Sequence, residues 1–178
     1  MSSILNSLIT RRRLLLGLAA WPLASLAMSA AEAPTAGFRR WGSGEFRRLG
    51  FLVYEATLWA SGDDPLRPPL ALKLTYKRNI SGRDIAEASV KEIRNLGVAD
   101  EARLRGWGEQ MLRIFPDVRP GDHILGIQFP DEARFFFNDR SIGTIEDPAF
   151  ARAFFAIWLD ARTSAPDLRA ALLKRQDS

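Results

Sequence analysis

The stretch that most constrains the fold is ARFFFNDRSIGTIEDPAFARAFFAIWLD, from Ala133 to Asp160. Its first half predicts a β-hairpin, because Asn138-Asp139 separates two short runs rich in aromatic and β-branched residues. Its second half predicts a helix, because Asp147 can cap the first turn and Pro148 suits the first helical position. This helix is apolar over much of its circumference, so we expect it to lie deep against a sheet.

The same stretch is unusually rich in aromatic residues, and this richness allows two interpretations. The rings either fill a hydrophobic core or form the wall of a pocket for an apolar ligand. Because the rings recur at strand and helix spacing, the core is the default interpretation. The residues concerned are Phe135, Phe136, Phe137, Phe150, Phe154, Phe155 and Trp158.

The rest of the chain supplies further strands. Residues 70–77 (LALKLTYK) alternate strictly between apolar and other residues, which predicts a strand with one solvated face. Residues 50–60 and 123–129 are rich in β-branched and aromatic residues and are also expected to be strands. Two similar segments, GFRRWG and EFRRLG, lie across Gly42-Ser43-Gly44, and they either indicate a hairpin there or arise by chance.

Three more helices are expected. Ser81 and Asp84 form a capping box at the start of one helix, which ends at Gly97. A second helix is expected from about residue 100 to 115, and a last one from residue 164 to about 174. Strands in hairpin pairs, with helices between and after them, predict an α+β fold with an antiparallel sheet and helices on one face.

The first 33 residues are interpreted as an export signal. Arg11, Arg12 and Arg13 precede an apolar run, and small residues follow it, which is the order of such a signal. The segment TRRRLL also fits the twin-arginine pattern, and an ordinary secretion signal with three arginines is the alternative. We therefore expect an exported, periplasmic protein with one domain over residues 34–178. An uncleaved signal would be its only attachment to a membrane.

Composition narrows the chemistry of that domain. The chain has no cysteine and a single histidine, His123, so thiolate and histidine-rich metal sites are not expected. Without residues 1–33, 22 basic and 20 acidic residues remain, and this near balance of charge does not indicate nucleic-acid binding. No phosphate-binding loop is present, and we expect no metal and no cofactor.

Five stretches occur in an order that resembles the chalcone isomerase-like family, in particular its exported bacterial members. They are GSGEFRRLGFLVYEATLWA, ISGRDIAEASVKEI, IFPDVRPGDHILGIQF, FFFNDRSIGTIEDPAFARAFFAIWLD and SAPDLRAALL. The resemblance implies an open-faced β-sandwich, in which a large antiparallel sheet is backed by a layer of helices. It also implies that ligands lie in a cleft between the sheet and the helices.

The resemblance does not imply activity, because the family includes isomerases, fatty-acid-binding proteins and non-catalytic members. The isomerases place an Arg two residues after a Gly-x-Gly, and the matched residue here is Phe46. The Tyr and Asn that the plant enzymes carry on a helix are matched by Ile85 and Glu92, and their late Thr by Ala156. The positions that serve catalysis are therefore lost, and we assign no catalytic residue.

Candidate ligand-binding residues remain on the long strand pair. Arg47 and Arg48 directly follow the matched position, and Tyr54 matches a hydroxyl-bearing residue of the family. Arg48 shares strand parity with Phe46 and Tyr54, whereas Arg47 reaches the same face only through a bulge. An Arg and a Tyr beside an apolar cleft suit the carboxylate of a fatty acid or similar amphiphile.

The sequence is compatible with three functions. The first is a non-catalytic carrier or sensor that binds a small apolar or amphiphilic ligand. The second is an isomerase or intramolecular lyase in which Arg47 or Arg48 and Tyr54 act from shifted positions. The third is an envelope protein that binds a protein partner and no small ligand.

Overall fold

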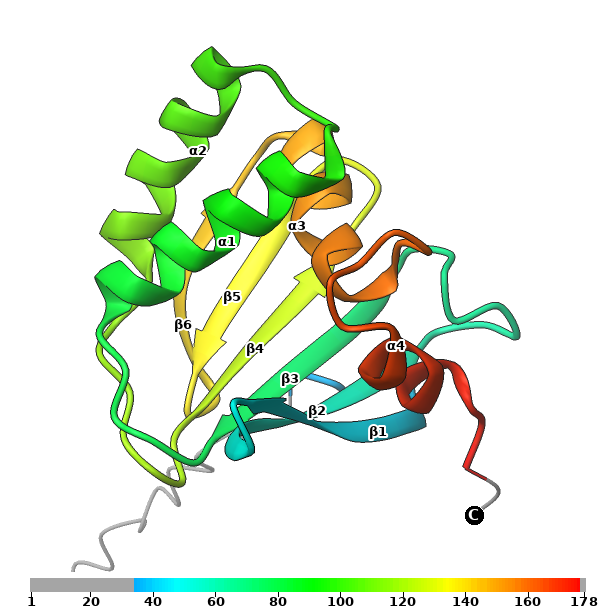
Figure 1. The fold of residues 1–178 in the computed structure, drawn as a ribbon. Coiled ribbons are helices and arrows are strands. Elements are labelled where there is room, and N and C mark those ends of the chain that lie inside the picture. Colours follow the sequence, from blue (N-terminus) through cyan, green and yellow to red (C-terminus); the bar gives the residue numbers. More distant parts are fainter. Residues whose placement is uncertain (1–33, 177–178) are drawn as a thin grey trace, which may run out of the picture. The chain divides into compact units, whose positions relative to one another are not determined.

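The six strands of the computed structural model form one antiparallel sheet in sequence order, as Figure 1 shows. The structure describes residues 34–176, so the expected export signal lies outside the described residues. The strands are β1 (Arg39–Arg48), β2 (Phe51–Ala60), β3 (Leu70–Tyr76), β4 (His123–Gln128), β5 (Ala133–Phe137) and β6 (Arg140–Ile145). The helices are α1 (Gly82–Leu96), α2 (Glu101–Ile114), α3 (Pro148–Leu159) and α4 (Pro166–Leu173).

The helices form a layer on one face of this sheet (Figure 1). Helix α3 packs on β4 and β5, and α4 packs on β1 and β2. Helix α1 packs mainly on α2 and α3 rather than on the strands. The expected α+β fold, an antiparallel sheet backed by helices, is therefore confirmed. Among residues 34–176, no helix combines the length and the apolar character needed to cross a membrane.

The caps and turns expected from local sequence are present. The Ser81 hydroxyl accepts the Asp84 N–H at 3.0 Å at the start of α1, and Gly97 ends this helix with a φ of 67°. One carboxylate oxygen of Asp147 accepts the N–H groups of Ala149 and Phe150, and the other accepts Trp107 Nε1–H at 2.9 Å. The cap of α3 thus also joins α3 to α2.

Most of α3 is buried, as its apolar sequence predicts. Phe154 lies at the centre of an aromatic cluster, with ring centroids 5.1 Å from Phe135 and 5.4 Å from Trp158. Phe150, Phe155 and Phe115 complete the contacts around this ring. These residues belong to the main core between the sheet and the helices.

The expected turn at Gly42-Ser43-Gly44 is wrong, because these residues lie inside β1. The hairpin exists, but its turn is Leu49-Gly50. The glycines serve packing against α4: a methyl group at Gly42 would overlap the Leu172 carbonyl and lie 2.7 Å from the Ala171 carbonyl oxygen. They are therefore small so that α4 can approach the strand closely.

The far face of the sheet is less polar than the alternation in residues 70–77 predicts. Ala71, Leu125 and Ile127 are buried there in a second, smaller apolar cluster, against which Trp59 and Phe136 pack. The expectation of one solvated face is therefore only partly correct.

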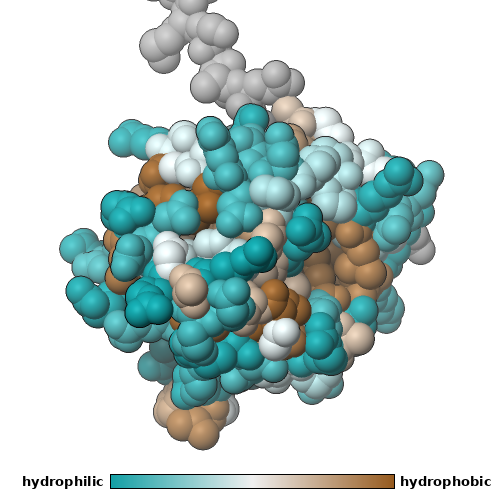
Figure 2. All heavy atoms as spheres, turned by 90° about the horizontal axis from the view of Figure 1, so that it is seen from above, coloured by the Kyte–Doolittle hydropathy of each residue, from teal (hydrophilic) through white to brown (hydrophobic). Residues whose placement is uncertain are grey.

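Figure 2 shows the molecule from above the view of Figure 1. On this side, hydrophilic residues predominate and hydrophobic residues appear in separate patches.

Candidate ligand-binding cavity

A cavity of about 280 Å³ lies between α1 and the sheet. It exists because α1 rests on α2 and α3 and leaves space above the strands. The sheet contributes mainly apolar residues and α3 contributes aromatic rings, among them Leu72, Leu74, Ile124, Phe135, Phe154 and Phe155. Several core rings therefore also form the wall of the cavity, which combines the two interpretations of the aromatic stretch.

The exposed lining residues mark where the cavity opens. Arg48 comes from the end of β1, Asp84 and Ala88 from α1, and Ser164 from the loop after α3. The opening consequently lies between these three elements.

Strand register sorts the lining residues into a polar and an apolar end. Phe46, Tyr54 and Tyr76 are neighbours across β1, β2 and β3. Four residues further along β3, Leu72 pairs with Gly126, which pairs with Phe135. The two rows are separated by about 13 Å at the rise of an extended strand. The cavity thus has tyrosines at the end nearer Arg48 and only apolar groups in the row beyond.

Two phenols define the polar end. The Tyr54 hydroxyl accepts Trp158 Nε1–H at 3.0 Å and keeps its own proton to donate. Tyr76 is only 3% exposed, and its hydroxyl makes no hydrogen bond to any residue in the described part of the chain. Burial raises the pKa of both phenols above the ordinary range, so both are neutral donors at physiological pH.

Charges of both signs border this end. Glu92 lines the cavity, accepts the Ser164 hydroxyl at 2.7 Å, and its charge helps to raise the pKa of Tyr54. Arg48 lines the opening, and its guanidinium forms no ion pair within residues 34–176. An anionic ligand would therefore be attracted at Arg48 and repelled at Glu92, and also at Asp84, whose carboxylate lies at the opening.

The structure separates the two candidate arginines. A register shift between Phe46 and Arg47 leaves Val53 as the extra residue on β2, so β1 keeps its regular alternation. Phe46 and Arg48 accordingly line the cavity, and Arg47 is not among the lining residues. Arg47 instead pairs with Glu45 at 2.8 Å.

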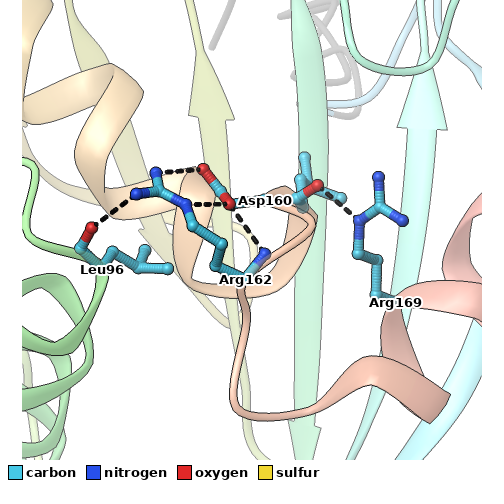
Figure 3. A network of polar contacts seen from close by, with 5 residues as sticks. Leu96, Asp160, Arg162 and Arg169 are labelled. Carbon is cyan, nitrogen blue, oxygen red and sulfur yellow. Dashed lines mark hydrogen bonds and ion pairs between the residues drawn. The ribbon is translucent and has the colours of Figure 1, made fainter.

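A polar network fixes the loop that carries Ser164 (Figure 3). The Arg162 guanidinium donates two hydrogen bonds to the Asp160 carboxylate and one to the Leu96 carbonyl at the end of α1, and the Arg162 backbone N–H donates a further one to Asp160. Arg169 of α4 donates to the Leu159 carbonyl at 2.8 Å. The ends of α1, α3 and α4 are thereby held together at one side of the cavity. No cluster of acidic or histidine side chains within residues 34–176 is placed to hold a metal ion.

Comparison with known proteins identifies the family. The family model described as chalcone isomerase-like matches residues 53–174. The chain belongs to the chalcone isomerase-like family. An uncharacterized protein of Haemophilus influenzae is 30% identical over 148 residues, covering 82% of this chain and 73% of that protein.

A solved structure shares the fold. The crystal structure of AtFAP1, a fatty-acid binding protein of Arabidopsis thaliana, superposes with a TM-score of 0.59 at 11% sequence identity. The match covers 78% of this chain and 87% of that one. At this identity the likeness establishes the fold of this chalcone isomerase-like chain and leaves its ligand to be argued from the site.

The positions matched to family catalytic residues carry unsuitable side chains in this cavity. Phe46 lines it and stacks on Tyr54 with ring centroids 4.9 Å apart. Ile85 and Glu92 line it from α1, whereas Ala156 is not a lining residue although its neighbours in α3 are. Neither Phe46 nor Ile85 can donate a hydrogen bond to an anionic oxygen.

Sequence reasoning missed Tyr76 and Ser164 as site residues. Tyr76 follows three leucines on one strand face, so the alternation assigns it to the core, where it does lie. The tyrosine itself could have indicated the site. A tyrosine on a buried strand face needs surroundings for its polar hydroxyl, and the neighbouring leucines offer no hydrogen-bond partner. Ser164 reaches Glu92 only through the fold of the loop after α3.

Proposed function

We propose that this domain binds a fatty acid or a similar small amphiphile in the cavity without transforming it. The observation that carries the proposal is the cavity of about 280 Å³ with tyrosines and Arg48 at one end and apolar walls beyond. Its volume is near the lower limit of ligand pockets, which are roughly 300–1,000 Å³. A single chain of moderate length suits it better than a bulky polycyclic molecule. The fold shared with AtFAP1 supports this proposal.

The charges suggest how such a ligand is oriented. The carboxylate meets the guanidinium of Arg48 at the opening, where a charge-assisted hydrogen bond is available. The chain passes Tyr54 and extends toward the row that contains Leu72 and Phe135. Glu92 opposes a carboxylate at Tyr54, so the negative charge stays near the opening.

Calorimetry on the full chain tests this arrangement. Saturated fatty acids of about 8 to about 18 carbons and the corresponding primary alcohols span the chain lengths that a small pocket admits. Arg48→Ala is expected to weaken the binding of fatty acids about tenfold and the binding of alcohols much less, because only the acids lose a charged contact. Glu92→Gln is expected to strengthen the acids. Arg67→Ala, in the exposed loop before β3, is the matched arginine control.

The same titrations compare Arg48 with Arg47. A loss with Arg47→Ala as large as with Arg48→Ala would contradict the assignment of Arg48 as the carboxylate contact. No heat with any ligand would remove the carrier hypothesis and favour the partner-binding alternative.

We also propose that the domain does not cyclise chalcones. Cyclisation needs stabilisation of an anionic oxygen and positioning of the substrate, and each is worth several kcal/mol of barrier. With Phe46 and Ile85 at the matched positions, both contributions are missing. The expected result is no turnover above the spontaneous rate. Efficient turnover would support the isomerase or lyase alternative.

Export to the periplasm is part of the proposal and rests on residues 1–33. If the signal is of the twin-arginine type, changing Arg11 and Arg12 together to Lys leaves the precursor in the cytoplasm. Normal export of this variant would leave only an ordinary secretion signal.

A further inference from the structure

The tip of the β1–β2 hairpin exposes two large apolar side chains beside the opening of the cavity. Leu49 is 90% exposed and Phe51 is 59% exposed. Leu49 directly follows Arg48, which lines the opening. Most large apolar side chains of a soluble domain are covered, so two of them on one protruding turn call for an explanation.

The backbone of this turn makes the exposed leucine more unusual. Leu49 and Gly50 have φ values of 50° and 79°, as a two-residue turn with two left-handed positions requires. The β5–β6 turn has the same pattern at Asn138 and Asp139, with φ values of 47° and 66°. Asn and Asp tolerate this conformation, whereas a leucine is strained in it. The fold thus retains an apolar side chain at a position where a polar residue would be more stable.

Basic residues surround the apolar tip. Arg47 and Arg48 precede Leu49, and the Arg78 guanidinium lies over the Phe51 ring at 4.6 Å from its centroid. Arg47 is neutralised by Glu45, but Arg48 and Arg78 have no carboxylate partner within residues 34–176. Apolar side chains flanked by unpaired guanidinium groups are complementary to an anionic bilayer, where the phenyl ring and the leucine enter the interface and the arginines meet headgroups.

We propose that the tip of the β1–β2 hairpin docks on anionic lipid membranes. The docking surface consists of Leu49, Phe51 and Arg78, with Arg48 shared between the tip and the opening of the cavity. This arrangement places the opening next to the lipid surface, which is the source of any amphiphile that the cavity takes up. The docking itself does not depend on the proposed cavity ligand, because Leu49 and Arg78 do not line the cavity.

Cosedimentation with vesicles tests the proposal on the full chain. Wild type is expected to bind vesicles containing about 30% phosphatidylglycerol more tightly than phosphatidylcholine vesicles, and to lose this preference as salt is raised. Leu49→Asn is expected to weaken binding to the anionic vesicles about tenfold, which is the value of burying most of a leucine. Arg78→Ala is expected to weaken it about fivefold.

Two features keep the test decisive. Leu49→Asn places a favoured residue at a left-handed position, so its melting temperature should not fall, and weaker binding cannot be ascribed to misfolding. Leu66→Asn and Arg67→Ala change an exposed leucine and an exposed arginine in the β2–β3 loop, which lies at the other end of β2, and should bind like wild type. Residues 1–33 are the same in all variants, so their own affinity for lipid cancels in the comparison.

Three outcomes would overturn the proposal. The first is that the hairpin variants bind anionic vesicles as tightly as wild type does. The second is that wild type binds neutral and anionic vesicles equally. The third is that Leu49→Asn abolishes self-association or binding to a protein but leaves vesicle binding unchanged. Calorimetry of the same variants with fatty acids separates this test from that of the cavity, because lipid docking and cavity binding are measured independently.

Discussion

The hydrogen bond between Trp158 and Tyr54 allows a test of how the polar end of the cavity is built. Among residues 34–176, Tyr54→Phe removes the only acceptor of Trp158 Nε1–H, and Trp158 is 6% exposed. An unsatisfied buried donor costs about 1–3 kcal/mol. The removed hydroxyl is itself partly desolvated, which returns some of this cost. We therefore expect Tyr54→Phe to lower the free energy of unfolding by about 1–2 kcal/mol.

Tyr76→Phe is the matched control for this substitution. Its ring is buried beside Tyr54, with ring centroids 6.0 Å apart, and its hydroxyl makes no hydrogen bond within the described residues. Tyr76 lines the cavity, and no fully buried side-chain polar atom in the described residues lacks a partner, so this hydroxyl is in contact with the cavity. Removing a hydroxyl that faces the cavity and has no protein partner is expected to leave stability nearly unchanged. The comparison therefore isolates the hydrogen bond from the general effect of replacing a buried tyrosine.

Urea unfolding followed by circular dichroism gives both values, and Trp158→Phe completes a double-mutant cycle. The cycle should give a coupling of about 1 kcal/mol between Tyr54 and Trp158, because the lost volume of the indole cancels in it. A coupling below about 0.3 kcal/mol is within ordinary additivity and would refute the reasoning. So would a loss with Tyr76→Phe that equals the loss with Tyr54→Phe.

Two further substitutions test other parts of the fold. Gly42→Ala places a methyl group against the backbone of α4 and should cost about 1–3 kcal/mol, whereas Gly62→Ala, with no atom within 4 Å, should cost almost nothing in the same urea assay. Arg162 lowers the pKa of Asp160 to about 2, below its usual value of 3.8. The stability from this pair is present above about pH 4 and is lost as pH falls through about 2, so Asp160→Asn should be slightly less stable than wild type at pH 7 and equal to it near about pH 1. A difference that persists at about pH 1 would show that the carboxylate charge is not the cause.

Features that depend on a few neighbouring residues could be predicted from the sequence. The Asn138-Asp139 turn and the caps at Ser81 and Asp147 are examples, because each satisfies backbone groups within three residues. The layer arrangement also followed, since an apolar helix after a hairpin has few places to be buried. Local chemistry therefore determined the element boundaries well.

Features that depend on distant contacts could not be predicted. Gly42 and Gly44 look like turn residues, but their small size serves the approach of α4, which lies more than a hundred residues away in the chain. The position of the extra residue on β2, at Val53, decides that Arg48 and not Arg47 lines the cavity. A sequence pattern gives parity along one strand and does not show which of two strands bulges.

The aromatic stretch shows why core and pocket were hard to separate. Phe154 packs against five other rings and also lines the cavity, so the same side chain stabilises the fold and forms the wall. The lining also contains small residues: Gly126 lies between Leu72 and Phe135 in the sheet, and Ala88 and Ser89 belong to α1. A glycine in a central strand removes packing and lets another group approach closely. Here a Cβ at Gly126 would lie 3.0 Å from the Phe155 ring, so the glycine lets this ring pack closely on the strand. The rings alone therefore do not distinguish a core from a pocket, because the space beside them depends on where α1 rests.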